Sequence, residues 1–179
     1  MNPKLKQTIR EYAESILIAF VLAMFIRTFF VQAFKIPTGS MRSTLIEGDR
    51  ILVNKLLYRF KEPQRGDIIV FKYPLNPKRD FIKRLVASAG ENVEIKDGNI
   101  FIGGKIADNE ILKEIYYYNC GDYGQENTSI KVAKKSLFVL GDNSAVSKDS
   151  RYWGFVPRKN LSGKAFLIYW PPKRFRILR

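Results

Sequence analysis

The feature that most constrains the fold is an uncharged apolar run near the N-terminus, from Ser15 to Ile26. A helix needs about 20 residues to cross a bilayer, so this run alone is short. The segment from Tyr12 to Phe34 is long enough, and Arg27 falls toward its outer end, where a long side chain can reach the headgroups. We therefore expect a transmembrane anchor over residues 12–34.

A cleavable signal peptide is the alternative for this segment, because Val31-Gln32-Ala33 could serve as a small-residue cleavage site. The segment stays aromatic to its end, which favours the anchor. Lys4, Lys6 and Arg10 precede the run and favour a cytoplasmic N-terminal segment over residues 1–11. The remainder of the chain is then expected on the outer face of the cell membrane, as a single-pass protein.

Beyond residue 36 the sequence is typical of a mostly β domain with short antiparallel strands. Asp97-Gly98 is the strongest hairpin signal. The length of 179 residues leaves room for one compact domain with a small subdomain. We expect a core formed by residues 35–91 and 135–179, interrupted by an inserted β subdomain over residues 92–134. The expected strands, which are rich in β-branched and aromatic residues, are 50–55, 67–72, 80–86, 93–96, 99–102, 136–140 and 164–170.

The chain is strongly basic, with 31 Lys and Arg against 17 Asp and Glu and a net charge of +14. This balance fits anionic lipids or nucleic acid. Nucleic acid is disfavoured, because no zinc-ligand spacing, helix-turn-helix pattern or aromatic RNA-binding signature accompanies the charge. Cys120 is the only cysteine, so the chain can form no intrachain disulfide, and a thiolate metal site is excluded. We expect Cys120 to be partly buried in a loop.

A serine follows the apolar segment closely, in Lys35-Ile36-Pro37-Thr38-Gly39-Ser40-Met41, and the sequence contains no histidine. A Ser-His-Asp arrangement is therefore excluded. If Ser40 is a nucleophile, a lysine is the remaining common base, and Lys83 lies on a strand-like segment. An ordinary lysine has a pKa near 10.4, which burial lowers. Taken singly, Ser40 could cap a short turn and Lys83 could be a solvated strand residue.

Four segments, in this order, resemble the bacterial type I signal peptidases over almost the whole chain. They are residues 37–41 with Thr44-Leu45, residues 65–71, residues 83–91, and residues 141–143 followed by 147–154. The resemblance implies a membrane-anchored Ser/Lys endopeptidase that removes signal peptides from exported preproteins. It also implies that membrane lipids surround the anchor and that the reaction needs neither a cofactor nor a metal.

By this resemblance, Ser40 is the acylating nucleophile and Lys83 is the general base. The backbone N–H of Ser40 and the hydroxyl of Thr38 would form the oxyanion hole. A flexible lysine must be held in place to act as a base. The residues that the resemblance implies for this support are Ser147, which would orient the Lys83 amine, and Asp149 and Arg151, which would form an ion pair beneath the site.

The resemblance also implies a binding site for an extended substrate with small residues at the first and third positions before the scissile bond. The substrate would lie beside the strand near Asp80. The apolar walls implied for the pockets are Phe34, Ile36, Met41, Leu45, Phe81 and Ile82. Three positions depart from the usual pattern, namely Ser144, Val146 and Ala89, and we expect them to affect local stability or loop shape rather than activity.

Two other functions remain open at this point. A self-cleaving Ser/Lys repressor-type protease would share the dyad, but it would need a DNA-binding module or an internal cleavage loop. A non-catalytic, membrane-tethered basic domain would fit the composition, but it would explain neither the Ser40/Lys83 pair nor residues 141–151. For a source with photosynthetic membranes, the thylakoid is an alternative location.

Overall fold

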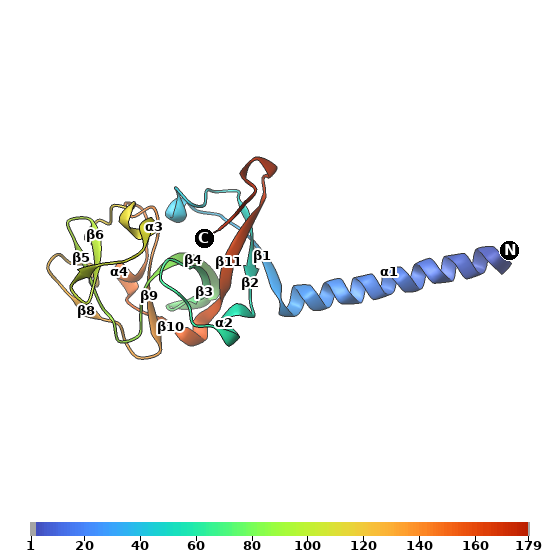
Figure 1. The fold of residues 1–179 in the computed structure, drawn as a ribbon, viewed down its shortest axis with the longest axis horizontal. Helices are drawn as coiled ribbons and strands as arrows, with labels where there is room; N and C mark the ends of the chain where they lie inside the picture. The colour runs from blue at the N-terminus through green and yellow to red at the C-terminus, as the bar shows by residue number, and fades with distance from the viewer. Residues whose placement is uncertain (1–2, 179) are drawn as a thin grey trace.

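The computed structural model describes residues 3–178, with side chains from residue 7 onward. Residues 1, 2 and 179, at the ends of the expected N-terminal segment and core, lie outside the described residues, as do the side chains of Lys4 and Lys6. Figure 1 shows a long helix, α1 (Pro3–Phe29), that projects from one side of a β domain. The start of α1 therefore lies far from the β domain.

Helix α1 is long and apolar enough to cross a membrane between Gln7 and Phe29, and none of that stretch is buried against the rest of the chain. It ends before the expected anchor does. Residues Val31–Lys35 form strand β1, which pairs antiparallel with strand β2 (Arg50–Asn54). Residues 31–34, the end of the expected anchor, are therefore extended, because they form part of the edge strand of a sheet. The extent of the anchor stays a prediction.

The main sheet is antiparallel and has eight strands within residues 3–178, in the order β1-β2-β11-β3-β4-β9-β10, with β12 paired to β11. Its longest strand, β4 (Asn76–Ser88), lies near the middle and carries Lys83. The remaining strands of this sheet are β3 (Ile68–Tyr73), β9 (Ser136–Leu140), β10 (Val156–Pro157), β11 (Leu161–Trp170) and β12 (Arg176–Ile177).

A second, smaller sheet lies on the side of the domain away from α1 (Figure 1). Its order is β7-β6-β5-β8, and all its strands fall inside the expected insertion. Asp97 and Gly98 connect β5 to β6, and both have positive φ, as a two-residue hairpin turn requires. The mostly β, antiparallel fold class is confirmed. The strands are β5 (Asn92–Lys96), β6 (Asn99–Ile102), β7 (Lys105–Ile106) and β8 (Ile130–Lys131).

The apolar core consists of three clusters, and β4 contributes to all of them. Leu85 packs with β3 and β9, Ile82 packs against the cluster under β1 and β2, and Val86 packs against the small sheet. A strand packed against all three clusters holds its core side chains in place. The helical turns that complete the fold are η1 (Gly39–Met41), α2 (Leu57–Phe60), α3 (Glu110–Lys113), α4 (Ser150–Trp153), η2 (Arg158–Asn160) and η3 (Pro172–Arg174).

Candidate active site

Ser40 lies in the short turn η1, on a loop whose two ends are joined. The Ile36 N–H donates to the Asp49 carbonyl at 2.8 Å, and the Gly48 N–H donates back to the Ile36 carbonyl at 2.9 Å. Met41 follows Ser40 and is completely buried in the core. The loop is therefore fixed at its base and beside the serine, while the Ser40 side chain remains partly exposed.

Lys83 reaches Ser40 from β4, with its Nζ donating to Ser40 Oγ at 2.7 Å and to the Ile82 carbonyl at 2.9 Å. The side chain lies over the ring of Phe81, with Nζ 5.6 Å from the ring centroid. Only 3% of Lys83 is exposed. The two residues singled out by the sequence, 43 positions apart, are thus in direct contact.

Burial changes the acidity of Lys83. Loss of hydration disfavours its charged form and lowers its pKa from 10.5 to about 8, although the negative charges of Asp149 and Asp142 act in the opposite sense. With a pKa of about 8, roughly one lysine in ten is neutral at pH 7, against a few in ten thousand for an ordinary lysine. The neutral amine can accept the proton that the hydroxyl must lose.

The loop after β9 holds the serine turn through its carbonyl groups. The Asn143 N–H donates to the Ser40 carbonyl at 3.1 Å, and Asn143 Nδ2 donates to the Gly39 carbonyl at 3.0 Å. Gly141 allows this close approach, because a Cβ there would lie 2.4 Å from the Ser40 carbonyl oxygen and 2.2 Å from Ser147 Oγ. The sequence interpretation assigned no role to Asn143, although it noted the segment that contains it.

Asp149 and Arg151 form a completely buried ion pair behind this loop. Arg151 Nε and Nη2 each donate to one carboxylate oxygen of Asp149 at 2.8 Å, and the Gly141 N–H donates to the same carboxylate at 3.0 Å. Ser144 is buried beside the pair, and its Oγ accepts from Arg151 at 2.7 Å and from the Tyr118 N–H at 2.9 Å. Ser144, which departs from the usual pattern, therefore connects the inserted segment to the loop after β9.

Two other residues with expected roles have fewer contacts. Ser147 is 2% exposed, and its Oγ has no hydrogen-bond partner among the described residues, so it does not contact the Lys83 amine. Its expected role in orienting Lys83 stays a prediction. Thr38 is exposed and its side chain makes no capping hydrogen bond to η1, which leaves the hydroxyl free to face a substrate.

Arg84, next to Lys83 in the sequence, forms a second buried cluster. It donates to both carboxylate oxygens of Asp142, at 2.8 and 2.6 Å, and to the Gly66 carbonyl at 2.6 Å. Thr44 Oγ1 donates to Asp142 at 2.5 Å and accepts from Arg84 at 3.1 Å. This cluster connects residues 36–49, the serine loop, to β4 and to residues 141–143. It was not predicted from the sequence.

A groove of about 340 Å³ passes over Ser40 and Lys83. A smaller hollow of about 40 Å³ adjoins it and is lined by Phe34, Ile36, Phe81 and Ile82, among others. Both spaces also have Asp80 in their walls. Four of the six expected apolar wall residues thus lie at this hollow. The other two, Met41 and Leu45, are completely buried in the core and line neither space.

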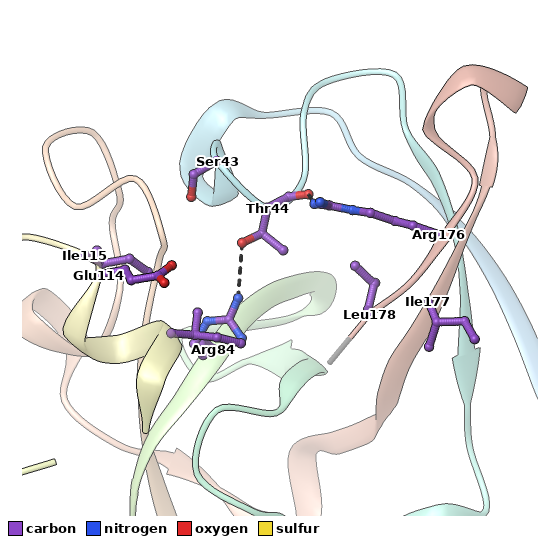
Figure 2. Close-up of a pocket in the computed structure, with 9 residues that line it drawn as sticks. Ser43, Thr44, Arg84, Glu114, Ile115, Arg176, Ile177 and Leu178 are labelled. Atoms are coloured by element: carbon purple, nitrogen blue, oxygen red, sulfur yellow. Dashed lines mark hydrogen bonds between the residues drawn. The ribbon is translucent and has the colours of Figure 1, made fainter. Parts of the chain in front are cut away.

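A separate cavity of about 400 Å³ lies between the serine loop, the inserted segment and the C-terminal strand (Figure 2). Figure 2 shows the Arg84 side chain donating to Thr44 at its edge. Neither Ser40 nor Lys83 lines it. Arg84 does and Lys83 does not, because successive side chains of a strand point to opposite faces. The lining residues are Ser43, Thr44, Arg84, Ile111, Glu114, Ile115, Arg176, Ile177 and Leu178.

Within residues 3–178, no group of three or more His, Cys, Asp or Glu side chains is placed to hold a metal ion. Cys120 is a free, half-buried thiol, as expected from the sequence.

Comparison with known proteins gives consistent matches. A family described as "Signal peptidase, peptidase S26" matches residues 9–170. The chain is 37% identical to "Signal peptidase I" of Aquifex aeolicus, over 92% of this chain and 85% of that protein. It is 41% identical to "Signal peptidase I" of Leptolyngbya laminosa, over 97% of this chain and 85% of that protein. It is also 33% identical to "Thylakoidal processing peptidase 1, chloroplastic" of Arabidopsis thaliana, over 96% of this chain and 51% of that protein.

Proposed function

The chain belongs to the signal peptidase family, peptidase S26, and is a serine endopeptidase; on this premise we propose that Ser40 is its nucleophile and Lys83 its general base. The observation that carries the proposal is the 2.7 Å contact between Lys83 Nζ and Ser40 Oγ in a site where the lysine is buried. Family membership disfavours both the repressor-type protease and the non-catalytic membrane domain.

The reaction follows from this contact. Neutral Lys83 takes the proton of Ser40 Oγ as the oxygen attacks the scissile carbonyl, and the oxyanion accepts hydrogen bonds from the Ser40 N–H and the Thr38 hydroxyl. Lys83 then gives its proton to the leaving amine, and an acyl-enzyme ester remains on Ser40. Lys83 next takes a proton from water, whose oxygen attacks the ester, and the proton returns to Ser40 as the acid product leaves.

The substrate lies in the groove as an extended chain. Residues 80–82 of β4 pair with β3 on one side, whereas pairing with β9 begins only at Arg84. The other edge of residues 80–82 is thus open for backbone hydrogen bonds with a peptide. The hollow of about 40 Å³ beside Phe81 and Ile82 has room for a methyl group and little more, which supports cleavage after Ala-X-Ala sites in exported preproteins.

Helix α1 anchors the enzyme to the membrane that holds its substrates. Cleavage after Ala33 would remove most of β1, whose five residues pair with β2, so the paired strand supports an uncleaved anchor. We place the N-terminus in the cytoplasm and the catalytic core, residues 35–91 and 135–179 with the insertion 92–134, on the outer face of the cell membrane. The thylakoid is the alternative location in a photosynthetic source, in line with the plant relative.

The test uses the full chain in lipid-supplemented detergent with a preprotein that carries an Ala-X-Ala site. We expect cleavage after the second Ala, and no cleavage when Phe replaces the first Ala, because the hollow, which neither Ser40 nor Lys83 lines, cannot hold a ring. Ser40→Ala should abolish turnover, whereas the control Ser162→Ala, on β11 away from the groove, should not. Cleavage by Ser40→Ala at the parent's rate would overturn the proposal.

A further inference from the structure

The groove over Ser40 and Lys83 differs in character between its two ends. Toward the small hollow its walls are Pro37, Asp80, Phe81 and Ile82, which the groove and the hollow share. Val146 and Lys148 line the groove but not the hollow. The first end is apolar except for Asp80, whose carboxylate is paired with Lys72 at 2.9 Å, and the rest of the groove presents a lysine without such a partner.

This difference gives the groove a direction for the substrate. If the residues before the scissile bond lead to the hollow and the reacting carbonyl lies at Ser40, the chain beyond it leaves along the part of the groove that the hollow does not share, where Val146 and Lys148 lie. The positive charge of Lys148 therefore faces the segment that becomes the new N-terminus of the mature protein.

Lys148 is held in place on the backbone but is free at its charged end. Its two neighbours, Ser147 and Asp149, are 2% and 0% exposed, so the backbone between them is fixed, whereas the Lys148 side chain is exposed. Both carboxylate oxygens of Asp149 bind Arg151. Within residues 3–178, Lys148 takes part in no salt bridge.

We propose that Lys148 is a specificity-determining residue that favours precursors with an acidic side chain at the first or second position after the scissile bond. The inference rests on the proposed function and deepens it. Two positions are within reach, because an extended chain advances about 3.3 Å per residue and a lysine side chain is long and flexible. Because alternate side chains of an extended peptide point to opposite sides, the preference falls on one of the two positions more than on the other.

The size of the effect follows from the exposure of Lys148. An exposed ion pair contributes a modest free energy that salt screens. We expect kcat/KM to be about three- to tenfold higher for an Asp precursor than for the matching Lys precursor at low salt, with Asn in between. At about 1 M salt the Debye length falls to about 3 Å, and the three rates should converge.

The experiment measures kcat/KM of the full chain in zwitterionic lipid–detergent micelles, which add no net surface charge. The precursors are identical except for Asp, Asn or Lys at the first or the second position after the cleavage site. The variants are Lys148→Gln and Lys148→Glu. Lys131→Gln, an exposed lysine on β8 outside the groove, is the matched control for loss of one charge.

The proposal expects Lys148→Gln to remove the preference, Lys148→Glu to reverse it in favour of Lys, and Lys131→Gln to keep the parent's order. Equal rates for the three precursors with the parent enzyme would overturn the proposal and leave the signal peptidase function standing. A preference for Asp that survives in Lys148→Glu, or that persists at 1 M salt, would also overturn it. If the parent cleaves none of the precursors, the proposed function itself fails, and the specificity proposal fails with it.

Discussion

Strand β4 carries two adjacent buried cations on opposite faces, and the protein treats them in opposite ways. Lys83 has no salt bridge among the described residues, and burial lowers its pKa to about 8. Arg84 is completely buried as well, but its guanidinium is bound to the carboxylate of Asp142. Burial without an adjacent carboxylate favours a neutral amine that can accept a proton, whereas burial with one keeps a structural charge. The face of β4 that carries Lys83 is thus the reacting face, and the face that carries Arg84 is the supporting face.

The largest expected effect is on the reacting face. Lys83→Ala should lower kcat/KM by about 10⁴-fold, because no other described group contacts Ser40 Oγ as a base. Thermal unfolding followed by circular dichroism should show a folded protein. Lys96→Ala, an exposed lysine at the end of β5, should cleave at the parent's rate. Near-normal turnover by Lys83→Ala would break the assignment of the base.

The second prediction sets the stabilities of the two faces against each other. Asp142→Ala should lower the free energy of unfolding by about 3–5 kcal/mol, because it leaves the Arg84 charge buried and unpaired. Lys83→Met should leave that free energy unchanged or raise it, since it removes a poorly hydrated amine without breaking an ion pair. Urea unfolding of both variants gives the comparison, and equal losses of stability would contradict it.

Two threonines provide a matched pair for the same question. Thr38→Val should lower kcat by about 10²-fold at unchanged stability, because the exposed hydroxyl of Thr38 would serve the oxyanion alone. Thr44→Val should lower the unfolding free energy by about 1–3 kcal/mol, because Thr44 bonds both Asp142 and Arg84. Steady-state kinetics and urea unfolding of both variants test this. A loss of stability in Thr38→Val would mean that the Thr38 hydroxyl stabilises the fold and does not serve the oxyanion alone.

The mildest change, which alters no residue, is a change of pH. Only the neutral amine of Lys83 is a base, so kcat/KM should fall about tenfold per pH unit below its pKa of about 8 and level off above it. Rates between pH 6 and 9.5, with the same precursor and lipid, give the profile. A rate that still rises steeply at pH 9.5 would mean that burial does not lower the pKa of Lys83.

The fold class could be predicted from the sequence because its signals are local, whereas the Ser40/Lys83 pair was predicted from the absence of histidine and from the resemblance of four ordered segments. Alternating apolar residues mark the strands, and Asp97-Gly98 marks the hairpin that the structure contains. Strand β1 was missed, since Val31–Lys35 continues the apolar character of α1 and only its pairing with β2 makes it a strand. Apolarity alone does not distinguish a membrane segment from an edge strand.

The Asp149–Arg151 ion pair was expected from the resemblance and is present, but the rest of the support could not be predicted, because it depends on contacts between distant residues. Arg84 and Asp142 are 58 positions apart, and Asn143 lies 104 positions from Gly39. The proximity of Arg84 and Asp142 follows from the pairing of β4 with β9, which sets Arg84 opposite Leu140. Similarly, the sequence identifies Met41 as apolar, but whether an apolar residue faces a groove or the core is decided by packing.

The central claim is that burial makes Lys83 a base at physiological pH. The most direct measurement is an NMR titration of the full chain in detergent with ¹³C-labelled lysine, in which the Lys83 signal is identified by its loss in Lys83→Ala. We predict a midpoint near pH 8 for this signal, well below the ordinary lysine value near 10.4. A midpoint for Lys83 at or above pH 10 would contradict the account.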